Sequence, residues 1–168
     1  MAITERLQNT TEVSYWTGEI PLEYIYTYGR AGEKYFRNLK DKGTFLGAKC
    51  DKCDIVYVPP RIYCEKCFQR LEDKYVDVGT IGTVHTFTVL YKNLDGTEKE
   101  KPVIMAMVRL DGTDGGVVHY LGEVEPSQVE IGMQVKAVLK PKKDRKGIIT
   151  DIKYLSPYNL RKNKEGRQ

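Results

Sequence analysis

Short segments in which hydrophobic and polar residues alternate fill the second half of the chain, from Asp77 onward. In one of them Val135, Ala137 and Leu139 alternate with polar residues, as in a strand with one buried face. Gly-rich or charged turns separate the segments. The pattern predicts five strands, at residues 80–91, 102–110, 116–124, 133–141 and 146–155. Five short antiparallel strands that need closure favour a small barrel over residues 77–156, and the OB-fold is a common five-stranded solution.

A helical pattern precedes these strands. The apolar side chains of residues 31–42 recur at the spacing of one helix face. The residues of this face are Ala31, Tyr35, Phe36 and Leu39. Gly43 follows, in the position where a glycine commonly ends a helix. We therefore expect one amphipathic helix at the start of a unit over residues 31–76.

The two ends of the chain have a different character. Residues 1–30 are rich in aromatic side chains and show no helical period, which predicts an extended arm. Such an arm can cover its own domain or form an interface with a partner, and the sequence leaves both interpretations open. Residues 157–168 are charged and nearly devoid of apolar side chains, so we expect a disordered tail.

The cysteines form two C-x-x-C pairs within 18 residues, namely Cys50, Cys53, Cys64 and Cys67. Two such pairs joined by a short hairpin can bring four thiolates to the corners of a tetrahedron, which favours a structural zinc site. Between the pairs, residues 55–58 form a predicted strand, and Pro59 and Pro60 predict a stiff, extended turn. A redox dithiol and free buried cysteines are the alternatives. Metal binding on the order of 10 kcal/mol would hold together a segment too short for its own core.

Iron is the second choice of metal, because rubredoxin-type knuckles also consist of C-x-x-C pairs. In those knuckles a glycine usually follows the second cysteine of each pair. Here Asp54 and Phe68 stand at these positions. No other feature of the sequence suggests electron transfer, so zinc remains the preferred ion and its role is to stabilise the fold.

The composition fits a soluble globular protein, with 168 residues, 40% of them hydrophobic, and a mean hydropathy of −0.49. No segment approaches the roughly 20 consecutive apolar residues of a membrane-spanning helix, and residues 1–9 lack the apolar core of a signal peptide. We therefore expect a cytoplasmic protein with no membrane partner. The net charge of +4 is a mild excess that does not by itself select a partner.

Four segments after the predicted helix together resemble a known family. They read FLGAKCDKCDIVYVPPRIYCEKC (residues 45–67), DVGTIGTVHTFTVLY (77–91), PVIMAMVRLDG (102–112) and VEIGMQVKAVL (129–139). The family consists of two-domain proteins, long catalogued as a domain of unknown function, in which an OB-fold follows a rubredoxin-like zinc ribbon. The resemblance runs from about residue 32 to residue 154. It implies a mainly β protein with the order helix, zinc ribbon, OB-fold barrel.

The same resemblance implies a function. Members of the family are typically partnered with thiolases or with 3-hydroxy-3-methylglutaryl-CoA synthase-like enzymes. The expected role is that of a non-catalytic subunit that bridges or completes the thiolase-fold enzyme and contributes to the acyl-CoA site. The aromatic arm before Ala31 extends beyond the shortest members of the family.

The residues themselves also favour a subunit that is not an enzyme. Thiolase chemistry needs a nucleophilic cysteine, and the predicted metal site uses all four. The chain contains no G-x-S-x-G elbow, no phosphate-binding loop and no H-E-x-x-H. Its two histidines, His85 and His119, stand alone on predicted strands, where a structural role is the more common one. We therefore expect a binding or scaffold subunit.

A nucleic-acid-binding module is the alternative, because zinc ribbons and OB-folds both recur in that role. The aromatic residues Phe87, Tyr91 and Tyr120 could stack on bases beside a basic loop. The loop contains Lys140, Lys142, Lys143, Arg145 and Lys146. The same loop could attract the phosphates of coenzyme A or remain a solvated turn, and Arg61 could bind a carboxylate, bind a phosphate or cover the ribbon. The candidates for coenzyme A or partner contacts are Arg61, Lys142, Lys143 and Arg145, and nucleic acid is the less favoured ligand.

Overall fold

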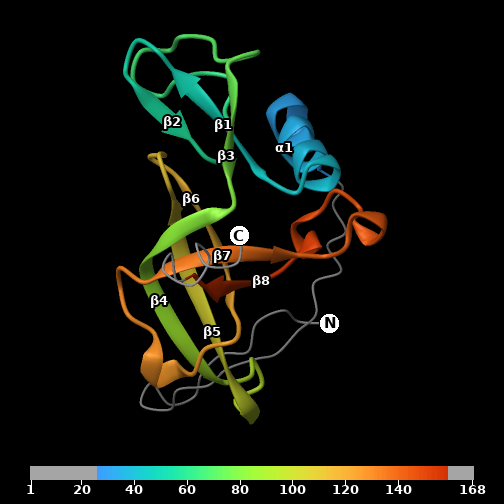
Figure 1. The fold of residues 1–168 in the computed structure, drawn as a ribbon, viewed down its shortest axis with the longest axis vertical. Helices are drawn as coiled ribbons and strands as arrows, with labels where there is room; N and C mark the ends of the chain where they lie inside the picture. Colours follow the sequence, from blue (N-terminus) through green and yellow to red (C-terminus); the bar gives the residue numbers. More distant parts are fainter. Residues whose placement is uncertain (1–25, 159–168) are drawn as a thin grey trace, which may run out of the picture.

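The computed structural model describes residues 26–158 (Figure 1). The predicted arm lies outside the described residues as far as residue 25, and the predicted tail lies outside them from residue 159. The described part is mainly β, as expected. Its elements are α1 (Gly29–Asp41), β1 (Phe45–Cys50), β2 (Ile55–Tyr57), β3 (Tyr75–Gly79), β4 (Ile81–Lys92), β5 (Glu98–Leu110), β6 (Gly116–Leu121), η1 (Pro126–Gln128), β7 (Gln134–Leu139), η2 (Lys142–Asp144), η3 (Ile149–Asp151) and β8 (Ile152–Pro157).

Helix α1 packs on β1 and on η3 through the face that the sequence predicted. Tyr35 and Leu39 on this face are buried. Beyond them, the side-chain amide of Asn38 donates to the carbonyl oxygen of Thr44 at 2.9 Å and to its hydroxyl oxygen at 3.0 Å. Gly43, with a φ of +76°, then turns the chain out of the helix as expected. Within residues 26–158, no helix has the length and apolar character needed to cross a bilayer.

A three-stranded antiparallel sheet follows, in the order β2-β1-β3. Strand β2 confirms the strand predicted at residues 55–58. The hydrophobic pattern of the sequence did not predict β1 or β3. Five of the six residues of β1 are buried, so the strand lacks the hydrophobic alternation that marks a half-exposed strand.

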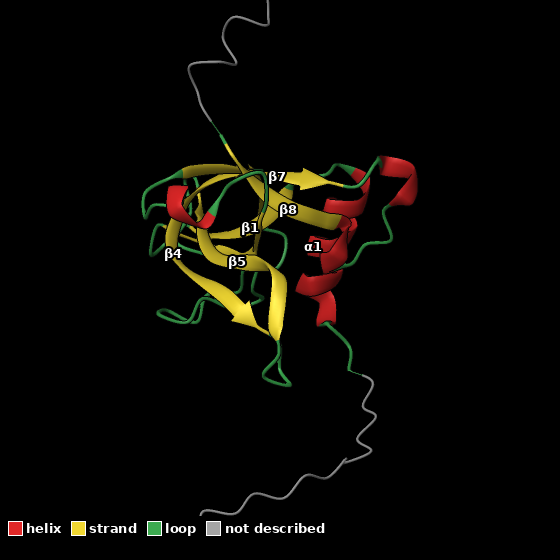
Figure 2. Ribbon diagram, turned by 90° about the horizontal axis from the view of Figure 1, so that it is seen from below, coloured by secondary structure: helices red, strands yellow, loops and turns green. Residues whose placement is uncertain are grey.

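Strands β4 to β8 close into a barrel in the order β4-β5-β6-β8-β7, and β7 pairs again with β4. Strands β6 and β8 run parallel, and the other neighbours run antiparallel. This is the five-stranded OB-fold that the sequence predicted. Figure 2, seen from below, shows α1 standing beside the barrel.

The fifth barrel strand begins at Ile152, six residues later than predicted. The cause is Asp151, which is fully buried and accepts backbone hydrogen bonds at its carboxylate Oδ2. The three N–H donors, at 3.0, 2.6 and 3.2 Å, belong to Lys146, Gly147 and Ile148. The preceding loop therefore curls around a carboxylate and cannot extend into the sheet.

One hydrophobic core joins the helix, the ribbon and the barrel. Leu39 of α1, Phe45 of β1 and Val58 after β2 belong to the same buried cluster as the barrel residues Val84 and Val108. A second cluster surrounds the cysteines in the ribbon. The ribbon is therefore packed on the barrel and is not an independent unit on a linker.

The loop between β5 and β6 clamps the ribbon to the barrel. The N–H of Asp114 donates to the carbonyl oxygen of Val56 at 3.0 Å, and the Asp114 carboxylate accepts the N–H of Val56 at 3.0 Å. Gly115 lies against Val58, where a Cβ on Gly115 would come within 2.4 Å of the Val58 carbonyl oxygen. The N–H of Gly116 donates to that oxygen at 3.2 Å. Only a glycine permits this close approach of two backbones.

Candidate metal centre

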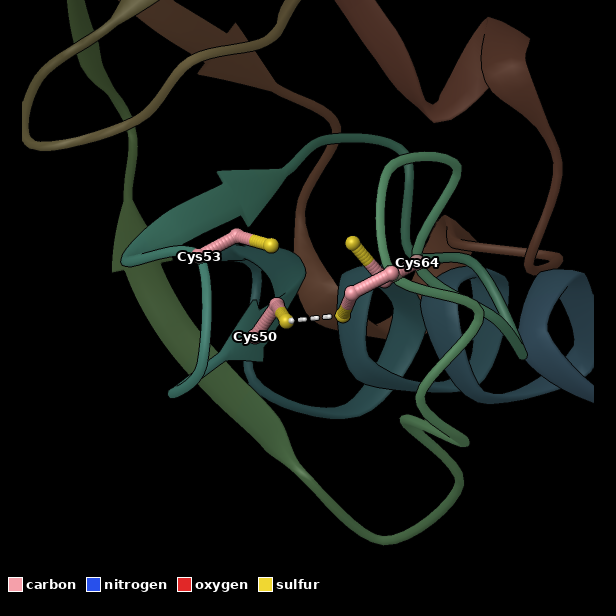
Figure 3. A group of neighbouring side chains, drawn as sticks. Cys50, Cys53 and Cys64 are labelled. Carbon is pink, nitrogen blue, oxygen red and sulfur yellow. Dashed lines mark hydrogen bonds between the residues drawn. The ribbon is translucent and has the colours of Figure 1, made fainter.

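The structure brings the four predicted metal ligands together at one end of the ribbon. Figure 3 shows the sulfur atoms of Cys50, Cys53 and Cys64 directed toward a common centre. The Sγ atoms of these residues and of Cys67 all lie within 4.8 Å of one another, and those of Cys50 and Cys67 are 3.5 Å apart. A tetrahedral ion with metal–sulfur bonds of about 2.3 Å requires sulfurs about 3.8 Å apart. The described geometry fits such an ion.

Two tight turns place the cysteines. Cys50 ends β1, and the chain turns through Cys53 into β2. After the proline-containing hairpin, a second turn holds Cys64 and Cys67, and the N–H of Phe68 donates to the carbonyl oxygen of Cys64 at 3.0 Å. Cys50 and Cys64 are fully buried, whereas Cys53 and Cys67 are partly exposed. Burial on one side and closure by four ligands leave no open coordination position, which is typical of a structural site.

The two knuckles keep the usual turn geometry although they lack the usual glycines. Asp54 and Phe68, which follow the second cysteine of each pair, take φ values of +51° and +56°. Both residues therefore adopt the left-handed conformation for which rubredoxin-type knuckles use glycine. The turn geometry is kept although the residue type has changed.

The electrostatics of the cluster favour a bound cation over four free thiolates. The hydrogen bond with Cys67 and burial raise the pKa of the Cys53 thiol to about 12. The Tyr57 hydroxyl lies 3.3 Å from Cys64 Sγ, and as a donor it lowers the pKa of that thiol to about 6. Without a metal ion the four sulfurs cannot all ionise at neutral pH because neighbouring thiolates repel one another. A bound divalent cation removes this penalty and binds the thiolates directly.

The cationic candidates outside the metal centre lie in two separate places. Arg61 is on the ribbon hairpin, and Lys142, Lys143 and Arg145 are on the loop after β7, beside the C-terminal end of α1. Arg61 forms an ion pair with Glu65. Its guanidinium also lies 5.1 Å from the centre of the Tyr57 ring. Arg61 therefore covers the ribbon while remaining half exposed.

Arg145 is bound within its own chain. Its Nε donates to the carbonyl oxygen of Lys140 at 2.8 Å, and a terminal nitrogen lies 3.5 Å from the carbonyl oxygen of Lys40. A cation at this position stabilises the C-terminal end of α1. Lys142 and Lys143, by contrast, are exposed on η2. Of the loop residues expected to bind phosphate, these two lysines are the more available.

The three aromatic residues considered for base stacking do not form one platform. Phe87 packs against the barrel interior, opposite Ala106. Tyr120 faces outward from β6 and is 47% exposed, and Tyr91 lies exposed near the end of β4. The sheet separates Phe87 from Tyr120. His119 is half buried, and desolvation lowers its pKa, which suits a neutral structural histidine.

Three residues that the sequence did not single out hold the site in place. Tyr57 supports Cys64, Asp114 clamps the ribbon, and Asp151 shapes the basic loop. The turn predicted between the strands at 102–110 and 116–124 is present, but the sequence does not reveal the clamp at Asp114. The contact between Asp114 and Val56 joins residues 58 positions apart, which no local pattern could reveal. The Tyr57 and Asp151 contacts lie within one hairpin and one loop and depend on how each of these folds.

Two domain families and several known proteins are similar to this chain. Residues 37–72 match the family model "ChsH2, rubredoxin-like zinc ribbon domain", and residues 75–140 match "ChsH2, C-terminal OB-fold domain". A protein named "DUF35 domain-containing scaffold protein" from Methanocaldococcus jannaschii is 30% identical over 117 residues, which are 68% of this chain and 82% of the relative. A relative of the same name from Methanothermobacter thermautotrophicus is 25% identical over 62% of this chain and 78% of its own length.

Two solved structures are similar as well. A DUF35-family protein of unknown function from Sulfolobus solfataricus aligns with a TM-score of 0.62 and 27% identity, over 77% of this chain and 87% of the other. A chain of the "Ltp2-ChsH2(DUF35) aldolase" aligns with a TM-score of 0.58 and 21% identity, over 79% of this chain and 98% of the other, and supports the fold alone. Together with the matches to both modules, these relatives show that the chain belongs to the DUF35 family, in which an OB-fold domain follows a rubredoxin-like zinc ribbon.

Proposed function

We propose that this chain is a non-catalytic scaffold subunit of a thiolase-fold acyl-CoA enzyme complex, of the acetyl-CoA acetyltransferase or 3-hydroxy-3-methylglutaryl-CoA synthase type. The observation that carries the proposal is the metal centre, because every cysteine of the chain lies in it. A thiolase-type nucleophile must therefore come from another subunit. The relatives named as scaffold proteins support the same role.

In this proposal the ion is zinc, with one ion per chain and a structural role. Four buried or half-buried thiolates form a site that suits Zn²⁺, which has no redox chemistry of its own. Cys50, Cys53, Cys64 and Cys67 would hold it. The ion stiffens the ribbon, and the backbone clamp between Asp114 and Val56 transmits that rigidity to the barrel. A rigid surface loses little conformational entropy on binding, which favours a docking role.

The docking surface consists of α1 and the ribbon hairpin, with the barrel placed near the acyl-CoA site of the partner enzyme. Arg61 is half exposed at the hairpin and is already oriented by Glu65 and Tyr57, so it can bind a carboxylate of the partner at low entropic cost. The exposed Lys142 and Lys143 are the cations of this chain that could approach the phosphates of coenzyme A.

Purification of the tagged native protein from its source cells, with nuclease treatment and mass spectrometry of co-eluting chains, tests the proposal. The starting material is the cytoplasmic extract, because we expect the complex to reside there. A thiolase-fold enzyme in fixed stoichiometry is the expected result. Recovery of nuclease-resistant nucleic acid without an enzyme would overturn the proposal and favour the nucleic-acid-binding alternative.

Two charge reversals on the ribbon then test the docking surface. Arg61→Glu should weaken the complex at least about tenfold, because a misplaced charge at an interface is costly. Lys52→Glu makes the same change at another exposed ribbon position and should leave the complex intact. Equal effects of the two variants, with metal content preserved in both, would exclude a specific role for the hairpin.

A further inference from the structure

The outer surface of β5 and β6 is largely apolar, and the proposed function does not use it. On β4 the exposed Thr86 and Thr88 lie opposite Met107 and Met105, and Leu90 extends the apolar surface. Cross-strand neighbours on β5 and β6 pair Met105 with Tyr120 and Met107 with Val118, and Leu90 on β4 pairs with Val103 on β5. Val118 and Tyr120 are 57% and 47% exposed. We define the outer face as the six residues Leu90, Val103, Met105, Met107, Val118 and Tyr120.

This composition is unusual for the solvent side of antiparallel strands. The alternate residues of the same strands, such as Ile104, Ala106 and Val117, already form the buried core. The outward positions should then be polar, as Gln134 and Lys136 are on β7. Contiguous exposed apolar surface marks a contact site. Among the described elements, α1 packs on β1 and η3, and the ribbon sits at one end of the barrel (Figure 1).

The first 25 residues of the chain have the composition of an occupant for this face. They contain two aromatic residues side by side at Tyr15 and Trp16, and they also carry apolar side chains at Ile3, Leu7, Val13, Ile20, Leu22, Tyr24 and Ile25. They include four glutamates and one arginine, a net charge of −3, whereas residues 26–158 carry +4. The two parts of the chain are therefore complementary in charge as well as in apolar character.

Reach does not limit such a contact. Twenty-five extended residues span up to about 80 Å. A compact domain of the described length has a radius of gyration of about 14 Å. Because the segment is tethered at Tyr26, its effective concentration at the barrel is on the order of 1 mM.

We propose that residues 1–25 bind the outer face of their own barrel. The aromatic and aliphatic side chains of the segment cover Met105, Met107, Val118 and their neighbours. Its glutamates lie toward the basic body of the protein. Flexible methionines at the centre of the face allow it to adapt to the segment. This inference is independent of the proposed enzyme partner.

Trp16 is the single tryptophan of the chain, so its fluorescence reports on this segment alone. In the isolated full-length protein we expect its emission to be blue-shifted, and its quenching by acrylamide to be weaker, than in the same chain unfolded in denaturant. Val118→Lys should shift the emission to the red and increase quenching. Ile131→Lys replaces a similarly exposed apolar side chain, in the loop before β7 and outside the face, and should change neither.

Methionine oxidation provides a second readout, which reports on the outer face of the barrel and not on the N-terminal segment. Tyr15→Ser combined with Trp16→Ser in the full chain should accelerate peroxide oxidation of Met105 and Met107, with the half-buried Met133 as internal control. For a segment affinity of about 0.1 mM and an effective concentration of about 1 mM, the expected acceleration is about tenfold.

Three outcomes would overturn the proposal. If Trp16 is as accessible in the folded isolated chain as in the unfolded chain, the contact is excluded. If Trp16 becomes protected only in the enzyme complex, the partner is the occupant. If protection of Met105 and Met107 disappears on dilution together with a dimer in sedimentation, the face belongs to an interface with a second copy of this chain.

Discussion

At the scale of single residues, the two knuckles show how a turn geometry persists without its usual residue. Asp54 and Phe68 both take a left-handed backbone conformation, but the strain differs. Aspartate tolerates this region because its short side chain can bond locally, and Asp54 pairs with Lys49 at 3.2 Å. Phenylalanine has no such compensation, and the ring of Phe68 is 79% exposed. Phe68 therefore carries backbone strain without burying its side chain.

Phe68→Gly should stabilise the protein. A glycine removes left-handed strain of about 1 to 2 kcal/mol and loses little packing, since the ring is exposed. After the entropy cost of glycine, the expected gain in the free energy of unfolding is about 0.5 to 1 kcal/mol. Chemical denaturation of the metal-bound protein measures it. Phe68→Ala removes the same ring without relieving the backbone, and equal stability of the two variants would contradict the strain argument.

Cys50→Ser should release the metal and unfold the ribbon. Cys50 is fully buried, and a hydroxyl is a poor ligand beside three thiolates. The loss of metal-coupled folding energy should lower the melting temperature by well over ~10 °C. Metal analysis and calorimetry check this result. A Cys50→Ser variant with full metal content and native melting would mean that the four-thiolate site is wrong.

At the scale of elements, the loop between β7 and β8 connects these two barrel strands and also contacts α1. The buried carboxylate of Asp151 accepts hydrogen bonds from backbone N–H groups of the loop, and Arg145 binds the last turn of α1. Gly147 also lies close to α1, since a Cβ at this position would come within 3.5 Å of the carbonyl oxygen of Phe36. One of the basic residues of this loop, Arg145, therefore has a structural role. Of the three cationic candidates in this loop, Lys142 and Lys143 remain available to a ligand.

Asp151→Asn should destabilise the protein in a pH-dependent way. Burial alone would raise the pKa of Asp151, but the N–H groups of Lys146, Gly147 and Ile148 outweigh it, so the pKa is lowered. Its stabilisation is therefore present above the unfolded pKa of about 4 and is lost as the pH falls through the lower folded pKa. We expect a loss of about 2 kcal/mol at neutral pH and almost none in strong acid.

Denaturation curves across this pH range check the expectation. Asp144→Asn is the matched control, because Asp144 lies exposed in the same loop. A pH-independent difference between Asp151→Asn and the wild-type protein would show that the carboxylate charge is not what shapes the loop.

At the scale of the whole molecule, the ribbon, the helix and the barrel share one core. Phe45 and Val58 come from the ribbon but pack with Val84 and Val108 of the barrel. The β5–β6 loop adds backbone hydrogen bonds across the same boundary. Such sharing predicts that the modules unfold cooperatively.

Removal of the metal by a strong chelator should therefore destabilise the barrel as well as the ribbon. We expect backbone amides of β5, such as those of Ile104 and Val108, to exchange with solvent at least about tenfold faster in the chelated protein. Hydrogen exchange followed by mass spectrometry measures this. Unchanged exchange in the barrel, together with loss of protection in β1, would show that the modules fold independently.

The sequence by itself determined the elements whose signals are local. Two C-x-x-C pairs specified a four-sulfur site, the spacing of Tyr35 and Leu39 specified a helix face, and alternation with turns specified a five-stranded barrel. These features depend on residues close together in the chain, where periodicity and ligand spacing act directly.

The tertiary structure decided what depends on distant segments meeting. It showed that β1 is a central strand buried on both faces, that Asp114 clamps the ribbon to the barrel, and that Arg145 binds α1. It also separated Phe87 from Tyr120 by placing them on opposite sides of the sheet. Burial and long-range hydrogen bonds follow from packing, and the local patterns of a sequence do not specify which distant segments pack together.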